Sequence, residues 1–250
     1  MRLAFPYNIV YSINIKFIIG GSILVDQKED IVFVQDTLKF WKKITVIQRN
    51  ILQQAIVKKS FAARESMHSN SDNCSGLFLI KSGQVRAYII SESGKEITLY
   101  RLFERDICIF SASCVMKNIA FDIYVEVEKP TEAYLIPASI FNQLSKESLP
   151  IQAFTNNLIA ARFSEVMWIM EQALFTSFDK RLANFLLEQS AIENSDILEI
   201  THEKIANHLG TAREVVTRML KYFQNEGIVT LSRGSIDILD REKLESLYEK

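Results

Sequence analysis

The chain has 250 residues, of which 48% are hydrophobic and 24% are charged, and its net charge is −1 at pH 7. This length suits one large or two small domains, and the composition is that of an ordinary globular protein with apolar residues for two cores. Because the chain as a whole carries almost no net charge, any affinity for nucleic acid must come from a local basic surface.

Cysteine and histidine are scarce in this sequence. The three cysteines, Cys74, Cys108 and Cys114, have no C-x-x-C spacing, and only three histidines are present. This is a poor disulfide framework, and it predicts a protein of the reducing cytoplasm. We expect no metal site built from clustered His and Cys. The sequence also lacks a nucleophile elbow, a P-loop and a G-x-G-x-x-G motif, so we do not expect an enzyme.

Residues 1–33 are the least informative part of the sequence. The run from Ile9 to Val25 is rich in Ile and Val but is interrupted by Lys16 and by two adjacent glycines. A membrane-spanning helix needs about 20 mostly apolar residues, and a secretory signal needs a small-residue cleavage site that is absent here. We expect an appended segment of unknown role, or translation assigned from too early a start, and no membrane partner.

The stretch from Val34 to Ile56 is predicted to be helical, because apolar residues recur there at spacings of three and four. Thr45, with Gln48 three positions later, forms a capping-box pattern that marks the start of a second helix within this stretch. A bridge of low hydrophobicity over residues 64–73 separates these helices from the next section.

From Leu77 to Pro137 the sequence predicts β-strands. Runs rich in Val, Ile, Tyr and Phe are separated by Ser-Gly pairs at 82–83 and 93–94, and Lys129-Pro130 is a further turn signal. Several short strands at this spacing are typical of a small antiparallel barrel or jelly roll. Such barrels hold ligands, but a cupin-like metal site would need clustered histidines, and only His68 lies nearby.

Six residues of the strand region are candidates for an effector site: Arg86, Tyr88, Tyr100, Cys108, Ser111 and Cys114. The arginine and the two tyrosines either line a pocket or lie on the outward faces of their strands, and we favour the outward position. Cys108 and Cys114 either take part in redox chemistry or are small buried residues, and burial is the commoner case.

After a short helix over residues 138–144, a long helix with two apolar stripes is predicted from Ile151 to Phe175. One stripe consists of Ile151, Phe154, Leu158, Ala161 and Trp168, and the neighbouring stripe consists of Ile159, Val166, Ile169, Met170 and Ala173. Two stripes imply two packing partners, which we take to be the barrel of the same chain and the same helix of a second subunit. The alternative is a single helix buried in a monomer.

A break in this pattern marks the boundary of the C-terminal domain. We place an interdomain hinge at residues 176–179 and expect Asp179 to cap a helix from Lys180 to Gln189.

The stretch from Ile200 to Phe223 predicts two short helices joined by a tight turn. Thr201 is a good N-cap for the first helix, and Gly210 suits its end because glycine adopts positive φ without a side-chain penalty. Thr211 and Glu214 have the T-x-x-E spacing of a capping box, which would begin the second helix.

On the second of these helices the polar and apolar residues occupy separate arcs. At about 100° per residue, one arc holds Val215, Val216, Met219, Leu220 and Phe223, and the other holds Arg213, Glu214, Thr217, Arg218 and Lys221. An arginine can bind the O6/N7 edge of guanine with two hydrogen bonds, and a carboxylate can accept one from cytosine N4. We favour a helix-turn-helix that reads the major groove over a surface helix with solvated charges.

The segment after this helix, VTLSRGSIDILD, predicts a hairpin that turns at Arg233-Gly234 and forms the wing of a winged helix, followed by a last helix over 241–249. Arg233 at its tip is placed to meet a DNA phosphate. The predicted DNA-binding residues are Thr201, Thr211, Arg213, Glu214, Thr217, Arg218, Lys221 and Arg233.

The segment GTAREVVTRMLKYFQNEGIV resembles the recognition helix and following turn of the Crp/Fnr family of bacterial transcription regulators, with the R-E-x-x-x-R core at Arg213, Glu214 and Arg218. The run IKSGQVRAYIISESGKEITLYRLFERDICIFSASCVM resembles an effector domain of this family. The resemblance covers about residues 34–250. It implies an α+β protein with an N-terminal antiparallel β jelly-roll of the cyclic-nucleotide-binding type, a long dimerisation helix and a C-terminal winged helix-turn-helix domain.

The resemblance also bears on cofactors. Relatives that bind cyclic nucleotides hold the sugar and phosphate with a Gly-Glu pair and an Arg-Ser/Thr pair. Here Ala120 and Phe121 stand near the second pair, no Gly-Glu precedes them, and residues 111–114 replace the phosphate cassette. A phosphodiester would lack its guanidinium partner, so cyclic AMP is not expected. Oxygen-sensing relatives hold an iron–sulfur cluster mostly through N-terminal cysteines, and this chain has none before Cys74, so that cofactor is not expected either.

Four sections are therefore expected: an appended segment over 1–33, an effector-sensing domain over 34–147, a dimerisation helix and hinge over 148–178, and a DNA-binding domain over 179–250. The expected function is transcription regulation by a homodimer on palindromic operator DNA, controlled by an unidentified small-molecule effector. RNA polymerase would be a further partner of an activator. The alternative is a ligand- or redox-sensing protein whose winged helix contacts other proteins.

Overall fold

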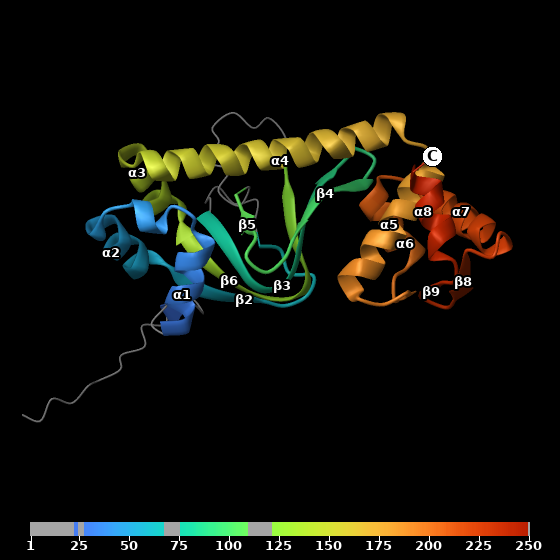
Figure 1. Cartoon of the computed structure of the whole chain (residues 1–250), viewed down its shortest axis with the longest axis horizontal. Helices are drawn as coiled ribbons and strands as arrows, with labels where there is room; N and C mark the ends of the chain where they lie inside the picture. The colour runs from blue at the N-terminus through green and yellow to red at the C-terminus, as the bar shows by residue number, and fades with distance from the viewer. Residues whose placement is uncertain (1–22, 25–27, 68–75, 110–121, 250) are drawn as a thin grey trace, which may run out of the picture.

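The computed structural model describes residues 23–24, 28–67, 76–109 and 122–249. The molecule is elongated, with a β-sheet domain and a small helical domain joined by one long helix, α4, that runs along both (Figure 1). The sheet domain and the long helix contain β1 (Ile23–Leu24), α1 (Lys28–Thr37), the 3-10 helix η1 (Trp41–Lys43), α2 (Val46–Ala55), β2 (Val57–Phe61), β3 (Gly76–Ile90), β4 (Glu96–Leu102), β5 (Ile107–Cys108), β6 (Tyr124–Pro137), α3 (Ala138–Glu147) and α4 (Leu149–Phe175). The helical domain contains α5 (Phe178–Glu193), β7 (Ile197–Leu198), α6 (His202–Leu209), α7 (Arg213–Asn225), β8 (Val229–Ser232), β9 (Ser235–Ile238) and α8 (Arg241–Glu249).

The sheet of the first domain is antiparallel, in the order β1-β2-β6-β3-β4, with β5 paired to β3. Its centre is a long, irregular ribbon of β3 and β6. Gly83 lies in this ribbon with φ +98°, and a Cβ there would lie 2.4 Å from the Pro130 carbonyl oxygen. The predicted turns at 82–83 and 129–130 are therefore wrong, because these residues face each other where the register shifts within two continuous strands. The turn at 93–94 is confirmed, since Gly94 lies between β3 and β4 with φ +78°.

Alternation along β3 and β6 gives the sheet two different faces. Val85 and Ala87 of β3 and Val127 of β6 are fully buried in a core with Tyr100 and Cys108. The residues between them, including Arg86, Glu126 and Glu128, lie on the opposite face because successive strand residues point to opposite sides. That polar face lies toward the helical domain.

Helix α1 is joined to the sheet by a buried carboxylate. Asp30 accepts hydrogen bonds from the Tyr134 hydroxyl and from the Lys81 ammonium, which lies 2.7 Å away. Burial would raise the pKa of Asp30, but these two bonds lower it below the ordinary value. Helix α1 spans the boundary that was expected after residue 33. The sequence did not indicate this, because Asp30 is held by residues that lie far from it in the chain.

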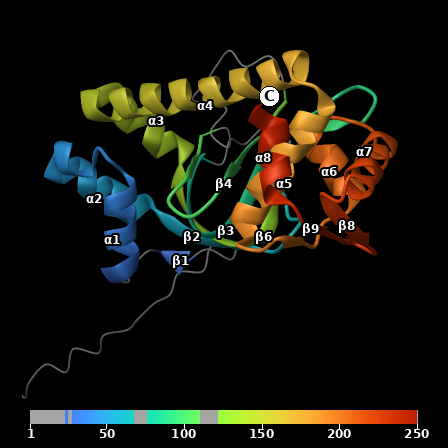
Figure 2. The same ribbon diagram turned by 45° about the vertical axis from the view of Figure 1, so that its right-hand side comes forward.

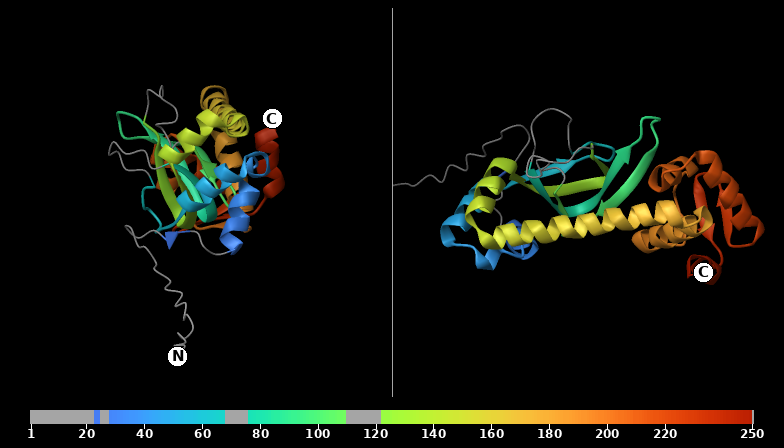
Figure 3. Two further views of the ribbon diagram at one scale, coloured as in Figure 1. Left: turned by 90° about the vertical axis from the view of Figure 1, so that its left-hand side faces the viewer. Right: turned by 90° about the horizontal axis from the view of Figure 1, so that it is seen from above.

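Helix α4 begins at Leu149 and extends beyond the sheet to the helical domain, as seen from above in Figure 3. Ile151, Phe154 and Leu158 of the first stripe pack against the sheet-domain core, whereas Ala161 and Trp168 of the same stripe are exposed. The second stripe does not point away from the sheet, because Ile159 and Val166 also pack on cores of their own chain.

A different row of α4 residues is exposed, at alternating spacings of four and three. We call this row the seam: Leu149, Ala153, Asn156, Ala160, Phe163, Met167, Met170 and Leu174. A repeat of 3.5 residues is the pattern of a coiled-coil contact. Of the ten residues of the two predicted stripes, only Met170 belongs to the seam.

The helical domain packs α5, α6, α7 and α8 with the sheet β7-β9-β8 around one apolar core, and α8 lies against α5 (Figure 2). Val216, Leu220 and Phe223 of α7 are buried in this core. The predicted hairpin is confirmed as β8 and β9, with Gly234 in its turn at φ +81°.

Two predicted helix caps are wrong. Helix α5 begins at Phe178 after Ser177, so Asp179 lies in its first turn rather than at the cap. Helix α7 begins at Arg213 after Ala212, and no side chain caps it. The Thr211 N–H instead bonds the Ala206 carbonyl and closes the end of α6. The predicted caps of α2 at Thr45, with Gln48, and of α6 at Thr201 are confirmed.

Candidate nucleic-acid interface

The outer face of α7 carries the polar residues that the sequence singled out. A hollow on this helix is lined by Arg213, Glu214, Thr217, Arg218 and Lys221. All but Thr217 are exposed. Glu214 has no capping role here, so its carboxylate is available to an external donor. Two guanidinium groups, an ammonium and a carboxylate thus share one open surface, a set suited to the edges of guanine and cytosine in a major groove.

Helix α6 fixes the position of α7. The Thr217 hydroxyl donates to the Arg213 carbonyl at 2.9 Å and lies 2.9 Å from Nδ1 of His202 on α6. Thr201 caps α6 by accepting from the Lys204 N–H at 3.2 Å, and Gly210 ends it with φ +66°. Thr201 and Thr217 therefore use their hydroxyls to hold the two helices, which leaves the charged side chains for an outside partner.

The remaining predicted DNA-binding residues lie at the edges of this surface. Thr211 is half-buried in the turn between α6 and α7, and Arg233 is exposed at the tip of the hairpin β8–β9.

The four described candidate effector residues do not form one site, because they divide between the two faces of the sheet. Arg86 is buried on the polar face of the sheet and bonds Glu96 at 2.6 Å and Glu126 at 2.9 Å. Its guanidinium also lies 4.1 Å from the Tyr88 ring centre. Tyr100 and Cys108 are buried in the core behind the other face of the sheet. Ser111 and Cys114, like Ala120 and Phe121, lie outside the described residues.

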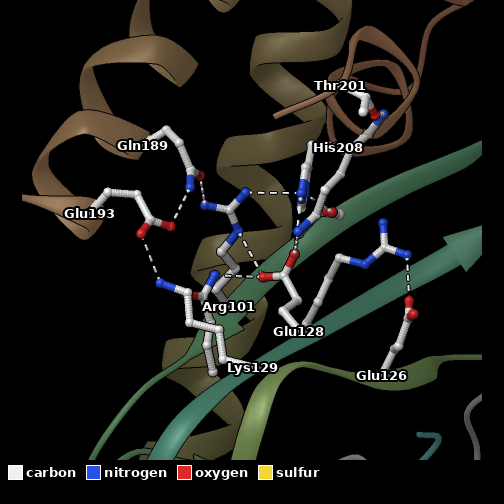
Figure 4. Close-up of polar contacts among 12 residues, drawn as sticks. Arg101, Glu126, Glu128, Lys129, Gln189, Glu193, Thr201 and His208 are labelled. Carbon is white, nitrogen blue, oxygen red and sulfur yellow. Dashed lines mark hydrogen bonds and ion pairs between the residues drawn. The ribbon is translucent and has the colours of Figure 1, made fainter. Parts of the chain in front are cut away.

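A buried cluster of polar residues, which we call the interdomain network, joins the sheet to the helical domain (Figure 4). Glu128 of β6 lies 3.4 Å from Nε of Arg101, 3.5 Å from the Lys204 ammonium and 3.3 Å from Nε2 of His208. The Thr98 hydroxyl lies 2.8 Å from Nδ1 of His208. Strands β4 and β6 thus hold α6 directly through a carboxylate that is almost fully buried.

The network extends to α5. Arg101 donates to Gln189 at 2.9 Å, and Gln189 donates in turn to Glu193 at 3.0 Å. Lys129 closes this side with a 2.9 Å bond to Glu193. Sequence reasoning missed the network. The strand alternation places Glu126 and Glu128 on one face, but nothing local to them indicates partners on α5 and α6.

Burial and the neighbouring charges together set the protonation of the network. Burial lowers the pKa of His208 to about 4, although Glu128 opposes the shift. Burial would raise the pKa of Glu128, but His208, Arg101 and Lys204 together lower it below the ordinary value. At neutral pH the network therefore holds an ionised Glu128 against two cations and a neutral imidazole.

Acidification is expected to destabilise the folded protein through His208. Its pKa is 6.5 when solvated and about 4 in the native protein. Between these values the unfolded chain binds a proton that the native chain does not. The contribution of His208 to the free energy of unfolding is therefore fully present above pH 6.5, and it falls toward pH 4 by at most about 1.4 kcal/mol per pH unit. His202, whose pKa is also lowered by burial, adds a loss of the same sign.

The measurement is the free energy of unfolding in urea at both ends of this pH window. His208→Gln removes the titrating group, so its stability should vary less with pH than that of the wild type. Parallel pH profiles for the two proteins would contradict this assignment.

Other kinds of site find no support in the described part of the chain. No group of three or more His, Cys, Asp or Glu side chains there could hold a metal ion. None of the helices in that part is both long and apolar enough to span a bilayer.

Comparisons with known proteins match both domains. Residues 180–247 match the family model of the Crp-like helix-turn-helix domain, and residues 58–148 match that of the cyclic nucleotide-binding domain. The regulatory protein HlyX of Actinobacillus pleuropneumoniae is 29% identical over 208 residues, which are 78% of this chain and 82% of that protein. Electron transport regulator A of Shewanella oneidensis is 27% identical over 201 residues, or 76% of this chain and 78% of that protein.

Solved structures give the same result. A crystal structure of a transcriptional regulator of the Crp/Fnr family from Eubacterium rectale is 47% identical, with a TM-score of 0.84. The match covers 86% of this chain and all of that chain. FixK2 from Bradyrhizobium japonicum, at 16% identity and a TM-score of 0.60 over 77% of this chain and 96% of that one, shares the fold.

Proposed function

This chain belongs to the Crp/Fnr family of transcription regulators, and from that premise we propose that it binds a palindromic operator as a homodimer through two copies of α7. The observation that carries the proposal is the open polar face of α7, where Arg213, Glu214, Arg218 and Lys221 are exposed and the opposite face is buried. The N-terminal residues of such a helix reach base edges in the major groove. Arg213 and Arg218 would contact guanines, and Glu214 a cytosine amine.

The seam supports a two-fold assembly. Phe163 and Leu174 are 64% and 66% exposed, although both are large and apolar. Exposed apolar residues that follow a heptad spacing mark a surface that another helix covers. We propose that the seams of two subunits pack together, so that the two α7 helices can lie about one turn of DNA, ~34 Å, apart.

The sheet domain is proposed to sense a small molecule and to change how the helical domains are held. The family consists of regulators rather than enzymes. A protein that acts on the bacterial chromosome works in the cytoplasm, which is the proposed location. RNA polymerase is a further partner if the operator contact activates transcription.

Arg213→Ala and Arg233→Ala are expected to weaken DNA binding in different ways. Loss of a base-contacting guanidinium from α7 should cost about 1–3 kcal/mol on the operator and relax the preference at one base pair. Loss of Arg233, which would meet a phosphate, should weaken operator and random DNA alike. Gel-shift titrations on both DNAs measure the two ratios, and equal losses on both for Arg213→Ala would refute base readout.

The proposed function itself is tested by a gel shift with promoter fragments of the protein's own and neighbouring genes. A band that resists excess competitor DNA supports it. A winged helix that contacts proteins instead would give no such band.

A further inference from the structure

We propose that the cavity between the two domains is the effector site, and that its ligand is a small molecule with one carboxylate on an apolar body. This inference rests on the proposed function, because it names the signal to which the regulator would respond. Of the predicted effector residues that the structure describes, only Tyr100 lines this cavity.

The cavity has a volume of about 700 Å³ and lies where β4, the second half of α4, α5 and the end of α6 meet. Most of its wall is apolar: Ile97, Leu99, Phe103, Trp168, Ile169, Phe185, Ala191, Ile192 and Leu209. This volume is within the range of small-molecule sites, which are mostly apolar with a few placed polar groups.

Dimerisation through the seam would leave this cavity uncovered. Glu165 and Gln172 of α4 line the cavity, while Met167 and Leu174 belong to the seam. Glu165 and Gln172 are each two positions from a seam residue, which is about 200° around a helix. The middle of the α4 wall of the cavity therefore faces away from the seam, while Ser164 and Trp168 lie at its edge, one position from the seam residues Phe163 and Met167.

Arg181 provides a cation in the cavity wall that has no counter-ion among the described residues. Its Nη1 donates to the Leu209 carbonyl at 3.1 Å, but its Nε is buried and has no hydrogen-bond partner there. Its guanidinium lies 5.5 Å from the centre of the Phe178 ring. Burial lowers its pKa, and no acidic neighbour opposes that shift.

The other charged residues of the cavity are already paired or bonded. Glu165 accepts from Arg162 at 2.7 Å, Arg101 lies against Glu128, and Glu188 accepts from Asn184. Arg181 is left with an Nε and Nη2 edge that can donate two parallel hydrogen bonds to one carboxylate. The apolar wall would take up the rest of the molecule.

A ligand in this cavity would touch both domains at once. Ile97 and Tyr100 of β4 line one side, and Phe185 of α5 and Leu209 of α6 line the other. A molecule that binds this arrangement of the two domains more tightly than it binds other arrangements shifts the population toward this one. A ligand in the cavity would therefore couple the sheet domain to the DNA-binding helices.

Isothermal titration calorimetry of the full-length protein with dodecanoate and 2-naphthoate tests the proposal. The two probes separate a flexible acyl chain from a planar aromatic body, and dodecan-1-ol is the uncharged control. We expect at least one carboxylate to bind, and dodecan-1-ol to bind more weakly than dodecanoate if the acyl chain is the one accepted. Arg181→Gln should weaken that carboxylate about 10- to 100-fold, because a hydrogen-bonded charge is lost.

Two variants keep the result interpretable. Arg105→Gln changes an exposed arginine of the sheet domain and should leave binding unchanged. Ser164→Phe places a ring into the cavity from α4 and should weaken the accepted probe without removing the cation. Binding of neither carboxylate to the wild type overturns the proposal, as does equal affinity of wild type and Arg181→Gln.

A gel shift without probe is run in parallel. Operator binding by a protein that binds neither carboxylate would overturn the cavity proposal and leave the proposed function standing. Carboxylate binding by a protein with no operator band would overturn the proposed function instead.

Discussion

Met167→Glu is expected to convert the dimer into a monomer and to lower operator affinity by about 100-fold or more, because each half-site then binds separately. Met167 lies in the middle of the exposed row, between Phe163 and Met170. In a two-fold contact each glutamate would meet apolar residues and the glutamate of the other subunit. A buried, unpaired charge of this kind is among the most destabilising changes at an interface.

Ala161→Glu is the matched control, since Ala161 is exposed on the same helix but lies off the seam. It should leave both the mass in solution and the DNA affinity unchanged. Light scattering coupled to size-exclusion chromatography gives the oligomeric state, and gel shift gives the affinity. A Met167→Glu protein that stays dimeric would show that the seam is not the dimer contact.

Glu128→Ala is the second change with a large expected effect. It leaves the Arg101 guanidinium, which is 10% exposed, next to His208 without the carboxylate that lies 3.4 Å from it. Removing one partner of a buried ion pair typically costs about 3–5 kcal/mol, far more than the pair contributes relative to apolar residues. The loss should appear as weaker docking of α5 and α6 on the sheet, in addition to a lower free energy of unfolding.

Glu132→Ala provides the comparison, because Glu132 pairs with Lys58 on the surface, where its side chain is 42% exposed. Such a pair is worth about 0–1 kcal/mol. Urea unfolding measures stability, and the rate of limited proteolysis between α4 and α5 measures docking. If the two variants unfold and are cleaved alike, the interdomain network does not hold the domains together.

Elements with a strong local pattern were predictable from the sequence. Thr45 and Thr201 cap helices as expected, and the two arcs of α7 are the buried and exposed faces that periodicity indicates. The caps at Thr211 and Asp179 failed because a competing local contact or an earlier helix start took their place. A capping pattern alone does not show which residue the chain will use.

Features that depend on distant contacts were not predictable. Asp30 is part of the sheet domain only because Lys81 and Tyr134 surround it, and Arg101 finds Gln189 across a domain boundary. On α4 almost every face is apolar, so composition could not show which stripe meets the sheet and which is left over. That distinction requires the position of the sheet.

The short connection between α4 and α5 limits the operators that this protein can accept. Only Thr176 and Ser177 separate the two helices, and both have extended backbones. Each residue has two soft backbone dihedral angles, so only about four rotations can reorient the DNA-binding domain without unwinding a helix. A connection this short allows the DNA-binding domain only a small range of orientations relative to α4. Insertion of extra base pairs between half-sites should therefore abolish recognition abruptly rather than weaken it in steps.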